Sequence, residues 1–183
     1  MTDVAIDLDA HARALVDANL YVTLGTADID GSPWVSPVYF ATADYADYYW
    51  VSAEDAAHSR NIEWRPRISM VIFDSQVPTY HGRAVYQSAT AAAVAGDDVE
   101  RGLAVYPGAA SRGASRVEAA DVTAPSRYRL YRATVTDAFV LCPREPRQPC
   151  ALHAIAADHR TPVAPWRQPE APAVPRLTGS ASG

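Results

Sequence analysis

The sequence predicts a mainly β protein, a small β-barrel of six or seven mostly antiparallel strands with two or three short helices. Two observations indicate this class. Short alternating segments rich in β-branched and aromatic residues follow one another closely, and compact turns containing Asp, Gly and Pro separate them. Sequential strands joined by such short turns form an antiparallel meander, because parallel strands need a longer crossover connection.

The N-terminal third predicts a helix followed by the first meander. Residues 7–18 carry apolar side chains on one face, and either Asp7 or Asp9 can cap this helix. Strands are then expected at 20–27, 33–41 and 48–52. Pro37 cannot donate a ladder hydrogen bond, so the second strand is expected to lie at an edge or to contain a bulge.

A second helix is expected over residues 53–65, with Ser52 as its N-cap and Pro66 ending it. Further strands are expected at 67–74 and 81–94, a helix at 97–108, and two strands within 127–141 hinged near Thr136. The predicted barrel domain therefore spans residues 1–142. Eight of the 14 prolines fall between Pro143 and Pro175, so residues 143–183 are expected to form a partly flexible tail with at most one or two helical turns, at 151–159.

Composition narrows the function. A net charge of -5 argues against a nucleic-acid partner, and no apolar run is long enough to span a membrane. The first residues lack the basic and apolar regions of a secretory signal, so a cytoplasmic protein is expected. All 16 basic residues other than histidine are arginine, which excludes a lysine Schiff base.

The two cysteines, Cys142 and Cys150, are expected to be reduced in that compartment. His153 and His159 lie close by in the sequence. However, the seven residues between the cysteines and the proline-rich surroundings match no common zinc pattern. The sequence therefore predicts no metal site.

Residues 48–67 carry the best candidate for a ligand site. Here a strand runs into a helix N-terminus, and Ser52, His58, Ser59 and Arg60 supply hydroxyl and cationic groups. A helix N-terminus offers free N–H groups to an anion, and a phosphate needs several such donors from one side. The alternative is a capped surface helix with solvated charges.

Three segments in order resemble one known family. They read GSPWVSPVYF, then YWVSAEDAAHSRNI, then PRISMVIFD. This order is similar to the pyridoxamine 5′-phosphate oxidase-like family of FMN-binding split β-barrels. The resemblance covers about residues 10–95, and residues 127–141 resemble the last barrel strands. It implies a homodimer that holds FMN at the subunit interface.

The resemblance also implies site residues. The isoalloxazine ring would lie against Ser36, Pro37 and Val38, with the backbone of Val51 near its polar edge. Ser52 would bind the phosphate together with His58, which stands where a lysine is common. The remaining cofactor-binding candidates are Ser59, Arg60, Gln76 and Arg83.

Flavin-dependent hydride transfer to or from a small organic substrate is the expected chemistry, with catalytic residues and substrate unidentified. The chain lacks the arginine and lysine of the true vitamin oxidase on its second strand, which argues against that activity. Three alternatives stay open: a deazaflavin-dependent reductase of the same fold, a non-catalytic protein that binds FMN or haem, and a dimer that has lost its cofactor.

Overall fold

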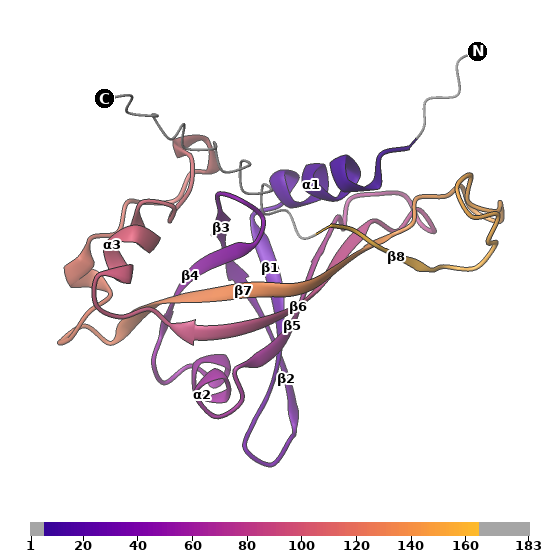
Figure 1. Ribbon diagram of the computed structural model, residues 1–183. Coiled ribbons are helices and arrows are strands. Elements are labelled where there is room, and N and C mark those ends of the chain that lie inside the picture. The colour runs from indigo at the N-terminus through magenta and orange to yellow at the C-terminus, as the bar shows by residue number, and fades with distance from the viewer. Residues whose placement is uncertain (1–5, 165–183) are drawn as a thin grey trace, which may run out of the picture.

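The computed structural model describes residues 6–164 (Figure 1). Its helices are α1 (Leu8–Ala18), α2 (Ala57–Trp64) and α3 (Asp98–Leu103), with short 3₁₀ turns η1 (Ala110–Arg112) and η2 (Ala119–Asp121). The strands are β1 (Tyr21–Ala27), β2 (Pro33–Tyr39), β3 (Ala41–Thr42), β4 (Asp47–Ala53), β5 (Arg67–Phe73), β6 (Ala84–Ala93), β7 (Tyr128–Leu141) and β8 (Arg160–Pro162).

The strands form one antiparallel sheet in the order β2-β1-β5-β6-β7-β4-β3, and β8 pairs with β7. The first and last strands of this order, β2 and β3, are consecutive in the chain and are separated only by Phe40. The sheet therefore curls round on itself as an incomplete barrel (Figure 1). It stays split where β2 and the end of β4 diverge, which confirms the split-barrel prediction.

The period-two pattern of the strands decides which face is buried. Val22 and Leu24 on β1 point inward, as do Met70 and Ile72 on β5, while the residues between them are more exposed. Trp50 packs face to face on Tyr131, its direct partner on the neighbouring strand β7, with ring centroids 5.6 Å apart. These side chains form the main core.

Each end of the barrel is covered by a helix (Figure 1). Asp7 caps α1 by accepting a hydrogen bond from the Ala10 N–H at 2.9 Å, as the sequence predicts. Helix α2 covers the opposite end. None of the helices within residues 6–164 combines the length and apolar character that crossing a bilayer requires.

A second, smaller core lies on the outer face of β4 and β7, where Val94, Val99 and Val122 pack around Leu130. Helix α3 approaches this face closely at Gly102. A Cβ atom added there would lie 2.6 Å from Leu130 Cδ2 and 3.0 Å from Tyr49 Cε1. Glycine is therefore required at this position for α3 to pack so near the sheet.

Most predicted elements are confirmed, with four corrections. The sheet has eight strands rather than six or seven, because β3 and β8 are only two and three residues long. Residues 127–141 form one strand, and the expected hinge is a bulge at Thr136, which the register with β6 skips. The third correction concerns the helical segments: residues 151–159 form turns without a helix, and the helix expected over 97–108 ends at Leu103.

The fourth correction concerns Ser52. It is not the N-cap of α2, because β4 continues to Ala53 through pairing with Tyr128, and α2 begins only at Ala57. The proline-rich segment after residue 142 contributes β8 to the sheet within the described residues. Residues 165–183 of the predicted tail lie outside the described residues.

Candidate functional site

His58 occupies the split between β2 and β4. Its Nδ1 atom lies 3.2 Å from the Ser36 hydroxyl on β2, and its Nε2 atom lies 2.8 Å from the Ser52 hydroxyl on β4. The imidazole and the Ser36 side chain are both buried, whereas Ser52 is half-buried. One side chain of α2 thus connects two strands that have no ladder between them at this level.

The cluster continues to Trp34, whose indole N–H donates to the Ser36 oxygen at 3.0 Å. One consistent arrangement has the Ser36 O–H donating to Nδ1 and the Nε2–H donating to Ser52. The Ser52 O–H then has no partner within the cluster and can be donated to a ligand. The three contacts would form a polarised relay that ends at the Ser52 hydroxyl.

Burial lowers the pKa of His58 below its ordinary value of 6.5. Burial thus disfavours the charged imidazolium form. A negatively charged ligand at Ser52 would oppose this shift by stabilising the imidazolium.

Two backbone edges line the same split. Strand β2 is the edge strand of the sheet, as Pro37 predicts, and pairs only with β1. Residues 50–53 of β4 pair with β7 on one side, and among the described residues no strand pairs with their other side. Ser36, Pro37 and Val38 thus lie on one edge, while Val51 and Ser52 lie on the other.

Side-chain directions divide these residues. Val38 is buried in the main core, whereas Pro37 is exposed on the opposite face of β2. Val51 packs against the second core. Only backbone groups of Val38 and Val51 are therefore positioned to meet a ligand in the split.

Helix α2 begins without a side-chain cap, so its first N–H groups are open to another acceptor. The helix is held in place by Asn61, whose amide donates to the Thr26 hydroxyl of β1 at 3.0 Å. The sequence alone does not predict this contact, because the pairing of Asn61 with Thr26 depends on how α2 lies against β1.

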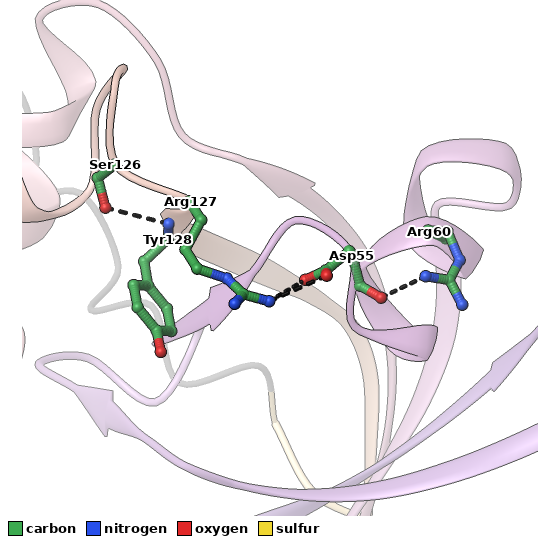
Figure 2. A network of polar contacts seen from close by, with 5 residues as sticks. All are labelled: Asp55, Arg60, Ser126, Arg127 and Tyr128. Atoms are coloured by element: carbon green, nitrogen blue, oxygen red, sulfur yellow. Dashed lines mark hydrogen bonds and ion pairs between the residues drawn. The ribbon is translucent and has the colours of Figure 1, made fainter.

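Two arginines approach the start of α2, and Figure 2 shows their shared contact with Asp55. The Arg60 guanidinium donates to the Asp55 carbonyl, while Arg127, from the chain entering β7, lies 2.8 Å and 2.9 Å from the two carboxylate oxygens. This hydrogen bond and charge hold the pKa of Asp55 below its ordinary value. Arg127 was not among the predicted residues, since only the β4–β7 pairing brings it here.

A hollow of about 400 Å³ lies on the far side of α2 from His58. Ser59 lines it together with Tyr131 and Arg129, and Arg129 forms an ion pair with Glu54 at 3.1 Å. Ser59 therefore faces β7, while His58, the preceding residue, faces β2 and β4. The two predicted site residues, His58 and Ser59, therefore lie on different sides of α2.

Gln76 and Arg83 do not join this cluster. Gln76 is exposed in the turn after β5, where its amide contacts the Ser75 hydroxyl at 3.2 Å. Arg83 lies near His11 of α1, at the other end of the barrel. Strands β5 and β6 carry these residues away from α2, so within one chain they form a separate surface.

An incomplete antiparallel barrel with a polar cluster in its split defines a class of protein, the split β-barrels. The family model described as pyridoxamine 5′-phosphate oxidase matches residues 8–142. The chain belongs to this family. The comparison with curated proteins gives no match.

Solved structures of three relatives show the same fold. A haem-binding protein from Mycobacterium smegmatis is 17% identical with a TM-score of 0.61, over 87% of this chain and 59% of its own. The haem storage protein HutZ from Vibrio cholerae is 20% identical, with a TM-score of 0.57 over 74% and 95%. A putative pyridoxamine 5′-phosphate oxidase from Listeria innocua is 12% identical, with a TM-score of 0.55 over 74% and 98%. This chain thus spans about three-fifths of the mycobacterial protein.

Proposed function

We propose that this protein binds FMN in the split of its barrel and uses it for oxidation or reduction of a small organic substrate. The observation that carries the proposal is the bridge from Ser36 through His58 to Ser52. It places hydroxyl and imidazole groups beside two unpaired backbone edges and an uncapped helix start. These are the donors that a phosphate ester and the polar rim of a flavin ring require.

The phosphate end of the cofactor fits the start of α2. Ser52 can donate its hydroxyl, the first N–H groups of α2 lack a side-chain cap, and Arg60 is exposed nearby. Arg127 is held by Asp55 but stays accessible, since its side chain is 66% exposed. No lysine is available, so hydrogen bonds and arginine must supply the whole anion site.

The flavin supplies hydride-transfer chemistry when it is bound. The protein would position the ring through the backbone edge of β2, including Ser36 and Pro37, and would tune its potential through those hydrogen bonds. The Ser52–His58 pair would hold a proton next to the phosphate.

We also propose that two copies of the chain assemble through the outer face of β2, β1, β5 and β6. This face carries Val35 and Phe73, which are 64% and 50% exposed, and a hollow of about 310 Å³ lined by Tyr86 and Phe139. Arg160 lies over both rings, 5.3 Å and 5.8 Å from their centroids. A partner covering this apolar face would bring its own residues to the split, where the proposed dimer would hold two cofactors.

The decisive experiment is an absorption spectrum of the purified protein, with the pigment released by heat and identified by mass. Released FMN supports the proposal. A released deazaflavin would instead support the alternative cofactor in the same fold. A colourless protein that takes up neither compound on titration would contradict redox function. Arg60→Ala should then weaken retention of FMN, with Arg101→Ala, on the distant helix α3, as the matched control.

Haem binding is the second candidate, favoured by the names of the relatives from Mycobacterium smegmatis and Vibrio cholerae. A haem iron needs an axial ligand such as histidine. His58 would have to give up a serine partner, whereas His81 is half-buried and lies 3.8 Å from Glu145. A haemin titration that gives a Soret band, lost in His81→Ala or His58→Ala, would favour haem over FMN.

A further inference from the structure

Four side chains from the segment after β7 converge on one point. They are Cys142, Cys150, His153 and His159, and their sulfur and nitrogen atoms all lie within 4.8 Å of one another. Both cysteines are buried and neither forms a disulfide. This group lies outside the proposed flavin site, beside the paired ends of β7 and β8.

The distances match tetrahedral zinc. Bonds of about 2.3 Å to sulfur and about 2.0–2.1 Å to nitrogen place a sulfur and a nitrogen about 3.6 Å apart, and two nitrogens about 3.3 Å apart. In this protein His153 Nδ1 lies 3.6 Å from Cys142 Sγ and 3.5 Å from Cys150 Sγ. His159 Nε2 lies 3.4 Å from Cys150 Sγ and 3.2 Å from His153 Nδ1.

The surroundings orient the ligand atoms. His159 Nδ1 lies 3.0 Å from the Ala157 carbonyl, which can only accept, so the proton is on Nδ1 and the Nε2 lone pair points into the cluster. The His153 backbone N–H donates to Cys150 Sγ at 3.2 Å. A thiolate with such a donor is suited to bind a metal.

Two local structures bring the four residues together. Cys142 and His159 directly follow and precede the last ladder pair of β7 and β8, and the Cys142 N–H donates to the His159 carbonyl at 3.0 Å. Cys150 and His153 share a tight turn, in which the Ala154 N–H donates to the Cys150 carbonyl at 2.9 Å. The loop brings these two pairs face to face.

We propose that these four residues form a structural zinc site. Two thiolates and two imidazoles in a tetrahedral arrangement select zinc, and four protein ligands leave no open position for catalysis. The site would revise the prediction of no metal, which rested on spacing along the chain. That spacing is unusual because a strand pairing, rather than a short loop, joins the first ligand to the last.

A bound zinc ion would also hold the loop between β7 and β8 in a defined conformation. Residues 151–158 are all exposed and have no helix or strand, so they bury little apolar surface of their own. A metal bound by residues from both ends of the loop would hold it against β7. The role is independent of any cofactor in the split.

The test begins with untagged full-length protein and its metal content by mass spectrometry. About one zinc per chain is expected, with at least a tenfold loss of bound zinc in Cys150→Ser and in His159→Asn. His81→Gln, which alters an imidazole outside the cluster, should keep its zinc. Circular dichroism of the variants should retain the strand signal, because strands β1 to β7 pair with one another without the loop.

Two measurements on the unaltered chain keep the proposal testable if a variant fails to fold. Replacement of the metal by Co²⁺ should give the strong visible absorption of a tetrahedral site with two sulfur ligands. Removal of zinc by a chelator should speed tryptic cleavage after Arg147, which is exposed in the loop. A protein that contains no zinc and takes up neither Zn²⁺ nor Co²⁺ would overturn the proposal, as would bound iron or a Cys142–Cys150 disulfide in its place.

Discussion

His58 Nε2 lies 2.8 Å from the hydroxyl of Ser52, and this contact joins helix α2 to the end of β4, which pairs with β7 on one edge only. The same imidazole reaches Ser36 on β2, so a single residue spans the split of the barrel. A contact of this kind can stabilise the fold, bind a ligand, or do both. Substitutions in the cluster separate these roles, because ligand affinity and the free energy of unfolding are measured independently.

Ser52→Ala should weaken FMN binding more than it weakens the fold. The hydroxyl is the group proposed to donate to the phosphate, and a lost hydrogen bond to a charged group costs about 1.5–3 kcal/mol. The dissociation constant should therefore rise about tenfold or more, as measured by flavin fluorescence titration. Ser75→Ala, in the distant turn after β5, should leave it unchanged, and equal affinities for both variants would remove Ser52 from the site.

The stability of the ligand-free protein should fall as the pH drops below about 6.5. Burial lowers the pKa of His58 in the folded state, so the unfolded chain binds the proton more readily in this pH range. Protonation therefore stabilises the unfolded chain relative to the folded one, and the free energy of unfolding falls. His11, whose pKa burial also lowers, adds a slope of the same sign. Urea unfolding at pH 7.5 and 5.5 measures the difference.

His58→Gln keeps a polar side chain but does not titrate, so it should reduce this pH dependence. His81→Gln is the matched control and should retain the slope of the parent protein. If His58→Gln has an unchanged slope, the buried imidazole is not the source of the effect. A smaller slope in the parent protein when FMN is bound would show that the ligand raises the pKa of His58.

Val35→Glu should convert the proposed dimer to a monomer. Val35 is 64% exposed on the outer apolar face, and a buried carboxylate without a partner would cost several kcal/mol at an interface. Light scattering after size-exclusion chromatography gives the mass. Ile29→Glu, at a position 56% exposed in the β1–β2 turn, should remain dimeric. A parent protein that is monomeric at micromolar concentration would contradict the assembly.

Gly102→Ala should destabilise the protein by about 1–3 kcal/mol, although alanine is the better helix former. The added methyl would meet Leu130 and Tyr49 and push α3 away from β4 and β7. Denaturant unfolding of this variant and of Arg101→Ala, an exposed change on the same helix, tests the expectation. A Gly102→Ala protein as stable as its parent would mean that the second core adjusts without cost.

Several features of this protein are decided by local sequence. The alternation of β1 and β5, the Asp7 cap of α1 and the edge position required by Pro37 could all be predicted, because each depends on neighbouring residues or on backbone chemistry. The order of the segments that contain Ser36, Ser52 and His58 was enough to predict the family.

Other features depend on which strands pair. Ser52 is not the N-cap of α2, because Ala53 pairs with Tyr128 and extends β4. The same pairing brings Arg127 to Asp55. The pairing of β8 with β7 brings Cys142 to His159 across 16 intervening residues. Local sequence therefore determined the strands and their faces, whereas the tertiary structure alone decided the partners, because contacts between distant segments depend on the register of the whole sheet.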